Sequence, residues 1–184
     1  MPAASGSEDY GRHFAAYLQD EFERPVETIP IYRGRDGRRG KNAARIEAVS
    51  AVYLGGGVAD HLLEAIAGTP VAAALAAKLQ SGGVVVAIAA AAQAAGAYVR
   101  SIAGGALVPG LGWLPDGVVE PNFEPDHDRR LRQLLAAPGV AWGLGIPSQS
   151  AVLLGPGDAV EVVGTAFYAA GASAEFEVLG EEDE

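Results

Sequence analysis

Residues able to act as nucleophiles, bases or metal ligands are few in this chain. It contains no cysteine, which excludes disulfides, thiolate metal sites and a thiol nucleophile. The three histidines, His13, His61 and His127, do not stand at the paired spacings of metal ligands, so we predict no metal site and no cofactor. Each histidine is expected at the surface. Any covalent chemistry would then need a hydroxyl group.

Two glycine-rich segments share some features with ligand-binding loops. Residues 34–41 lack the glycine spacing of a phosphate loop, and Asn42 stands where a hydroxyl would bind magnesium. Residues 55–57 lack the third glycine of a dinucleotide fingerprint, so we expect a tight strand-to-helix turn there. A cradle of backbone N–H groups for an anion or a carbonyl is the alternative at that turn.

The charges of the chain are unevenly distributed. Lys and Arg total 13 against 23 Asp and Glu, which gives a net charge of -10 and a pI of about 4.7. This balance argues against nucleic acid and anionic membranes as partners. We expect the basic residues 33–41 to form a solvated, mobile connection, with a pocket rim for acidic ligands as the alternative. Residues 180–184 are expected to be a solvated acidic tail.

The length of 184 residues is sufficient for a buried core, and we predict a single domain over residues 1–184. The first ten residues lack the basic and apolar pattern of a signal peptide, which predicts a cytoplasmic protein. Residues 82–99 are long enough to span a membrane. Their β-branched first half and alanine-rich second half instead favour a buried strand followed by a helix, so no membrane association is expected.

Hydrophobic periodicity predicts alternating helices and strands in the first two thirds of the chain and short strands at its end. Ser5 and Glu8 form a capping box for the first helix, and Thr69 with Pro70 opens a later one. Helices are predicted at 5–22, 43–48, 60–67, 69–79, from 89 to about 102, and at 128–135. Strands are predicted at 26–32, 50–54, 84–88, 118–120, 142–146, 151–154, 159–163 and 174–179, with a glycine- and proline-rich loop at 104–115.

This order of elements predicts an α/β fold. We expect a three-layer sandwich in which helices flank a mostly parallel sheet, with antiparallel strands near the C-terminus. In such sheets, ligands bind beyond the carboxyl ends of the strands. The binding site is therefore expected near residues 55–57 and 88–92.

Four segments between residues 31 and 163 carry a resemblance to a known family. They are the glycine turn at 55–57, Gly-Thr-Pro at 68–70 followed by Gly82 and Gly83, the segment 110–123, and the strand pair at 143–153. These resemble, in order, the G-G-x turn, the approach to the nucleophile elbow, the G-L-G-L-L-P…D-Q-H-F segment and the G-I-G-I-D-E-x-T-A-L pair of the cyanophycinase and aspartyl dipeptidase (peptidase E) serine peptidases. The resemblance implies the flavodoxin-like fold of the class I glutamine-amidotransferase-like superfamily, and a homodimer.

The resemblance also implies where the catalytic residues would stand. The nucleophile position falls on Ala89, or on Ala94 in a second alignment, the histidine position on Asn122 and the acid position on Ser148. A methyl group cannot attack a carbonyl, and an amide cannot accept a proton near neutral pH. We prefer Ala89 because it leaves a normal strand before it and a full helix behind it. The pocket candidates are Gly56, Gly57, Ala90, Asn122, His127, Ser148 and Gln149.

We therefore predict a catalytically degenerate homologue of these serine exopeptidases that acts as a binding or scaffold protein, with acidic peptides or amino acids as ligands. The alternative is an active hydrolase that works through replacement residues. These would be His127 as base, Asp126 or Asp128 to orient it, and Ser148 or Ser150 as nucleophile. A purely structural subunit is the third possibility.

The start of the chain departs from the family. Family members begin with a buried strand before the first helix, and residues 2–5 resemble the loop that follows that strand. We expect the strand to be missing, which leaves a gap in the sheet between residues 26–32 and 50–54. A longer chain, a sheet that closes differently and a strand borrowed from a partner are the alternatives.

Overall fold

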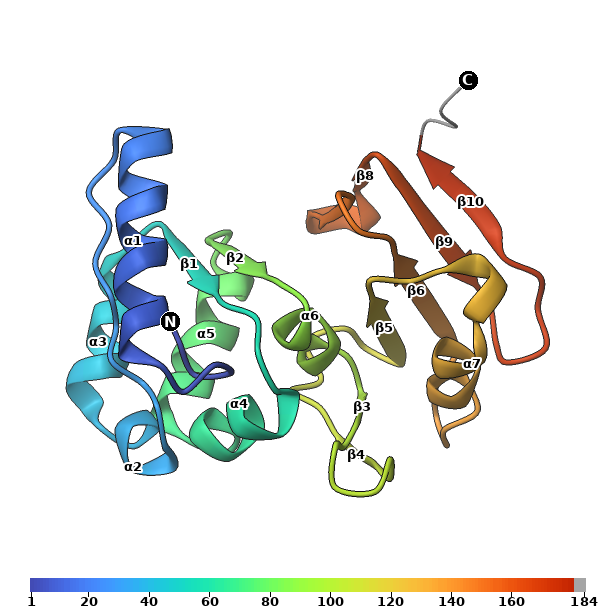
Figure 1. Ribbon diagram of the computed structural model, residues 1–184, viewed down its shortest axis with the longest axis horizontal. Coiled ribbons are helices and arrows are strands. Elements are labelled where there is room, and N and C mark those ends of the chain that lie inside the picture. The colour runs from blue at the N-terminus through green and yellow to red at the C-terminus, as the bar shows by residue number, and fades with distance from the viewer. Residues whose placement is uncertain (181–184) are drawn as a thin grey trace. The chain divides into compact units, whose positions relative to one another are not determined.

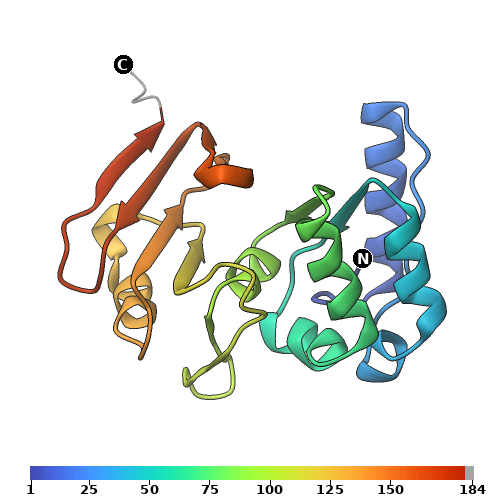
Figure 2. The same ribbon diagram turned by 180° about the vertical axis from the view of Figure 1, so that it is seen from behind.

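The computed structural model describes residues 1–180 and contains two compact units, residues 1–91 and residues 92–180 (Figures 1 and 2). Each unit is described by itself, and the single domain over 1–184 stays a prediction. Apart from Gly180, the predicted acidic tail lies outside the described residues. Helix α6 (Ala90–Ala95) begins at the end of the first unit and continues into the second.

The first unit is mostly helical and contains one pair of strands. Its helices are α1 (Glu8–Phe22), α2 (Gly34–Gly37), α3 (Gly40–Ala48), α4 (Ala59–Ile66) and α5 (Pro70–Gln80). Its strands, β1 (Ala51–Leu54) and β2 (Val84–Ala87), pair in parallel.

The second unit carries most of the strands and one longer helix. Its strands are β3 (Tyr98–Arg100), β4 (Leu107–Pro109), β5 (Gly117–Pro121), β6 (Trp142–Ile146), β7 (Ala151–Leu154), β8 (Val160–Val163), β9 (Thr165–Ala169) and β10 (Glu177–Gly180). Its helices are α7 (Arg129–Leu135) and the short turns η1 (Pro125–His127) and η2 (Pro156–Asp158).

The α/β prediction is confirmed, but the predicted mostly parallel sheet is not what the described strands form. They fall into four small sheets. In the largest, of order β10-β9-β6-β5, only β5 and β6 are parallel. Strands β3 and β4 form one antiparallel pair, and β7 and β8 form another. Long-range pairing decides this outcome, and it is weakly encoded in local periodicity.

Helix starts follow local chemistry closely. The Oγ of Thr69 accepts the N–H of Ala72 over 3.5 Å, and Pro70 occupies the first turn, so the predicted start of α5 is confirmed. The predicted cap of α1 is wrong by two residues. Ser7 accepts the N–H of Tyr10 over 3.2 Å, whereas Ser5 bonds to the carbonyl of Pro2 within the preceding turn.

Three other predictions are corrected by the structure. Residues 26–32 are extended but form no strand, because no neighbour pairs with them. The helix predicted to run to about residue 102 ends at Ala95, and β3 follows it and pairs with β4 inside the predicted loop 104–115. Strand β9 was not predicted, although it lies between β6 and β10 in the largest sheet.

Each unit has its own apolar core. In the first, α4 and α5 contribute Leu62, Ile66 and Leu75, which are fully buried with Ile31 and Leu54. In the second, Leu131 and Leu134 of α7 pack with Phe123, and Phe167 and Phe176 lie against that cluster. In residues 1–180, no single helix is long and apolar enough to cross a membrane, and only the bent pair α4 and α5 passes that test together.

Candidate functional site

The turn between β2 and α6 holds the predicted nucleophile position. Ala89 follows Ile88 at the end of the strand and precedes the first residue of α6, and its φ is +49°. A left-handed backbone costs a residue with a Cβ roughly 1 kcal/mol. A strained residue between a strand and a helix projects its side chain from a sharp turn, which is the geometry of a nucleophile elbow. Here the projected group is a methyl.

Ala94, the second alignment, stands elsewhere. It lies inside α6 and is fully buried. The choice between Ala89 and Ala94 stays a prediction.

The glycine turn after β1 lies against the Ala89 turn. A Cβ built on Gly56 would lie 3.4 Å from the Cβ of Ala89, so the backbone of Gly56 is in van der Waals range of the projected methyl. Gly57 has φ of +144°, and a Cβ there would lie 2.4 Å from the carbonyl of Ala4, which requires glycine. Ala90 begins α6, so its N–H has no partner within the helix. This end of the first unit can therefore offer backbone donors to a carbonyl or carboxylate oxygen.

The predicted histidine and acid positions lie together in the second unit. Asn122 follows β5, Ser148 follows β6, and the parallel register of the two strands aligns their ends. The Oγ of Ser148 donates to Oδ1 of Asn122 over 3.3 Å, and both residues are exposed. Asn122 and Gln149 have φ of +52° and +65°. A hydroxyl and an amide can orient a ligand, but neither exchanges protons near neutral pH.

The replacement residues are not assembled as a triad in the described structure. His127 is exposed, and its Nδ1 lies 2.8 Å from Glu124 rather than from a neighbouring aspartate. Asp128 instead pairs with Arg132 over 2.9 Å. Ser150 accepts the N–H of Thr165, and none of the hydrogen bonds described for residues 1–180 joins His127 to Ser148 or Ser150.

One polar cluster near Asn122 was missed by sequence reasoning. Glu120 in β5 is buried, and its carboxylate accepts Arg100 over 2.9 Å and the amide of Gln93 over 3.0 Å. The Nε of Arg100 is buried without a hydrogen-bond partner. The available signal was a charged residue directly after two valines in a predicted strand, because an acid in an apolar strand needs a buried partner.

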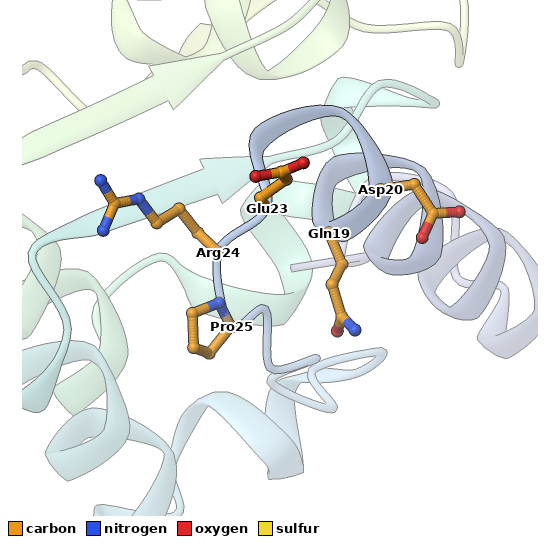
Figure 3. Close-up of a pocket in the computed structure, with 5 residues that line it drawn as sticks. All are labelled: Gln19, Asp20, Glu23, Arg24 and Pro25. Atoms are coloured by element: carbon orange, nitrogen blue, oxygen red, sulfur yellow. The ribbon is translucent and has the colours of Figure 1, made fainter.

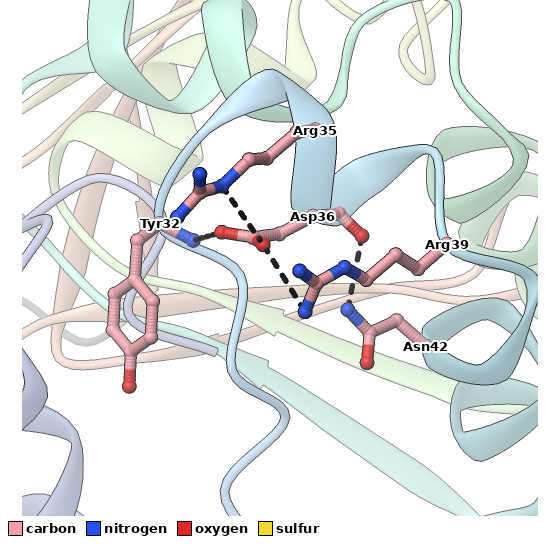
Figure 4. A network of polar contacts seen from close by, with 5 residues as sticks. All are labelled: Tyr32, Arg35, Asp36, Arg39 and Asn42. Carbon is pink, nitrogen blue, oxygen red and sulfur yellow. Dashed lines mark hydrogen bonds and ion pairs between the residues drawn. The ribbon is translucent and has the colours of Figure 1, made fainter.

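The basic segment is helical rather than a plain connection, although its basic side chains are exposed, as predicted, and its mobility stays a prediction. It forms α2 and the start of α3, and a Cβ on Gly37 would lie 2.2 Å from the carbonyl of Ala65. Asp36 is buried at its centre (Figure 4). It accepts the N–H of Tyr32 over 3.2 Å, and Arg39 lies 3.5 Å from its carboxylate.

Asn42 completes this cluster. Its Nδ2 donates to the carbonyl of Asp36 over 2.9 Å, and its buried Oδ1 makes no hydrogen bond. Burial, followed by the charges of Glu8 and Asp36, raises the pKa of Tyr32. A role of the segment as a rim for acidic ligands stays a prediction.

Two surface hollows lie away from the predicted site residues. An open hollow at the end of α1 is lined by Gln19, Asp20, Glu23, Arg24 and Pro25 (Figure 3). A second one, within the other unit, is lined by Tyr98 and Leu114 together with several prolines. No group of three or more histidine or acidic residues within 1–180 is arranged to hold a metal ion.

Comparison of the sequence with protein-family models and with curated proteins finds no match. The fold, in contrast, is similar to that of a solved structure, a peptidase from an acI-B1 Actinobacterium. The two agree with a TM-score of 0.83 at 20% sequence identity. The similarity covers 99% of this chain and 80% of the peptidase chain. The chain therefore has a peptidase-like fold.

Proposed function

From this peptidase-like fold, we propose that the chain is a catalytically degenerate homologue of serine exopeptidases of the cyanophycinase and aspartyl dipeptidase type, and that it binds a ligand without cleaving it. In that proposal the fold is the flavodoxin-like one of the class I glutamine-amidotransferase-like superfamily. The protein acts in the cytoplasm as a homodimer.

The conformation of Ala89 carries the proposal. A left-handed φ at a strand-to-helix turn is costly for alanine. Its methyl group cannot form a hydrogen bond that would offset this cost. Such a turn is useful when it exposes a reactive side chain. Retention of the turn with the reactive atom absent is the pattern expected of a site that has lost its chemistry and kept its shape.

The remaining groups suit a carbonyl or carboxylate ligand. In the first unit, Gly56 lies against Ala89 and Ala90 begins α6, so the backbone N–H groups of this turn are the donors that we propose for the ligand. Acidic peptides and amino acids are the ligand class that we propose. Backbone donors favour the oxygens of such ligands without requiring a charged residue.

Calorimetric titration with α- and β-aspartyl dipeptides tests the proposal, alongside a hydrolysis assay on the same panel. We expect saturable binding and no turnover. Ala89→Leu should abolish binding by filling the turn, whereas Ala16→Leu adds the same volume on an exposed part of α1 and should leave binding unchanged. Absence of binding to every member of the panel would overturn the ligand class.

The contact between His127 and Glu124 supports one alternative, an active hydrolase with a relocated base. A carboxylate that holds Nδ1 orients the imidazole. Turnover by the native chain that is lost in His127→Ala and retained in His13→Ala would replace the proposal with that alternative. The Ala89→Ser variant, measured in parallel, shows whether a hydroxyl at the turn is enough to restore cleavage.

A further inference from the structure

A hollow of the second unit lies at the start of β5 and plays no part in the proposed function. It is lined by Tyr98, Leu114 and Asp116 and by three prolines, Pro109, Pro115 and Pro138. Its volume is about 420 Å³, within the range of about 300 to 1,000 Å³ that is typical of small-molecule sites. Asp116 directly precedes β5 and Asn122 directly follows it, so the hollow and Asn122 lie at opposite ends of this strand.

The backbone around this hollow offers few hydrogen-bond donors. The three prolines have no N–H group at all. Ala97, Gly112 and Leu114 also line the hollow, and their N–H groups donate to carbonyls elsewhere in the second unit over 2.8 to 3.2 Å. A ligand whose polar groups are acceptors, such as a carboxylate or a phosphate, therefore finds little to bind there.

Hydrogen-bond acceptors, in contrast, are available at the hollow. Among residues 1–180, no donor reaches the carbonyls of Gly112, Pro138 and Gly139, which all line it. The carboxylate of Asp116 is exposed, and within the same range it forms neither an ion pair nor a hydrogen bond. None of the described residues that line the hollow is basic. The hollow is therefore suited to a cation that carries several donors.

The backbone around Asp116 is held by three hydrogen bonds. The carbonyl of Asp116 accepts the N–H of Ala141 over 2.8 Å and that of Trp142 over 3.3 Å. The indole N–H of Trp142 donates to the carbonyl of Pro115 over 3.1 Å. The φ of Asp116 is +53°, a conformation that aspartate and asparagine adopt more readily than most other residues. The carboxylate is thus carried by a turn that is bonded to the start of β6.

Tyr98 and Leu114 form the apolar part of the hollow. The face of a tyrosine ring attracts cations, and a planar guanidinium can stack on it. A guanidinium also has five N–H donors and no acceptor, which matches a surface of carbonyls and one carboxylate. An ammonium group is not planar and has three donors around a single point, so it uses this combination less fully.

We propose that this hollow is a binding site for a guanidinium group on a short apolar stem, as in an arginine side chain. The guanidinium stacks on Tyr98 and donates to the carboxylate of Asp116 and to the carbonyls of Pro138 and Gly139. The stem packs against Leu114 and the prolines. An arginine of another protein and a free arginine-like molecule share this chemistry. The site does not rest on the proposed function.

Replacement of the guanidinium by a neutral group of the same shape gives a sharp test. The probes are Nα-acetyl-arginine methylamide and its citrulline counterpart, titrated into the ¹⁵N-labelled full chain and followed by amide chemical shifts. The arginine compound should give saturable shifts in residues 97–98, 109–116 and 138–139. It should bind at least about tenfold more tightly than the citrulline compound, which has the same length but no charge.

Variants of the protein test the carboxylate and the ring separately. Asp116→Asn keeps the shape and the tolerated backbone conformation, and it should weaken binding of the arginine compound at least about fivefold. Glu177→Gln removes the same charge from an exposed position of the second unit and should change binding less than about twofold. Tyr98→Leu should weaken binding at least about threefold, whereas Tyr98→Phe keeps the ring and should not.

Two further ligands distinguish the sources of the guanidinium. Free arginine and the capped peptide acetyl-Gly-Gly-Arg-Gly-Gly-amide carry the same group. Tighter binding of the peptide assigns the site to a protein partner, and tighter binding of free arginine assigns it to a small molecule. No saturable shift up to about 10 mM, equal affinity of the arginine and citrulline compounds, or unchanged binding in Asp116→Asn would overturn the proposal.

Discussion

The guanidinium of Arg100 lies 2.9 Å from the carboxylate of Glu120, and this ion pair links β3 to β5. Glu120 is buried. Removal of one partner leaves the other charge without compensation in the interior, which typically costs several kcal/mol. We expect Arg100→Met to lower the free energy of unfolding by about 3 kcal/mol. Arg130→Met, at an exposed position, should change it by less than about 0.5 kcal/mol.

Urea denaturation measures both variants. The double variant Arg100→Met/Glu120→Leu should recover much of the lost stability, because a well-packed apolar pair can replace a buried ion pair. A double variant that is as unstable as the single one would show that packing, rather than the uncompensated charge, causes the loss.

Ala89 provides a prediction on backbone strain. Glycine accepts φ of +49° without cost, so Ala89→Gly should raise the free energy of unfolding by about 0.5 to 1 kcal/mol. Ala92→Gly, three residues later and inside α6, should lower it by a similar amount because glycine is unfavourable in a helix interior. Thermal melts of the two variants should therefore shift in opposite directions. A loss of stability in both would argue against strain at Ala89.

The amino group of Met1 predicts a pH dependence. Burial lowers its pKa from 8.0 to about 6, so the unfolded chain binds this proton more readily than the folded chain between those values. The free energy of unfolding should then rise between pH 6 and pH 8, by roughly 2 kcal/mol from this group.

Acetylation of the amino group isolates that contribution. The acetylated chain has no titrating α-amino group, while its histidines and lysines are unchanged. The difference in unfolding free energy between the two forms should change across this pH range. A constant difference would mean that the amino group is solvated in solution.

The contacts of Asp36 predict that this residue stabilises the basic segment 33–41. Its carboxylate accepts the N–H of Tyr32 and faces Arg39, and its carbonyl accepts Asn42. Asp36→Ala should cost about 1 to 3 kcal/mol, because the partly buried N–H of Tyr32 loses its acceptor. Asp20→Ala, in an exposed position of α1, is the matched control. Hydrogen exchange over residues 33–41 should accelerate in the first variant and remain unchanged in the second.

Local chemistry in the sequence determined many of the elements. Thr69 caps α5 and Pro70 stands in its first turn. The start of this helix could therefore be predicted from adjacent residues alone, without its tertiary contacts. The β-branched residues before Ala89 and the alanines after it likewise indicate a strand followed by a helix. The positions Ala89, Asn122 and Ser148 come instead from the resemblance to the serine peptidases, and what they bind stays a prediction.

Tertiary structure decided the features that depend on a distant partner. Residues 26–32 have the composition of a strand, yet they form none, because a strand exists only where another backbone satisfies its N–H and C=O groups. Residues 33–41 carry the charge of a solvated loop and their basic side chains are exposed, yet the segment is helical, Gly37 packs on Ala65 and Asp36 is buried. Periodicity and composition report what one segment prefers, whereas hydrogen-bond partners and buried charges are settled by which segments meet.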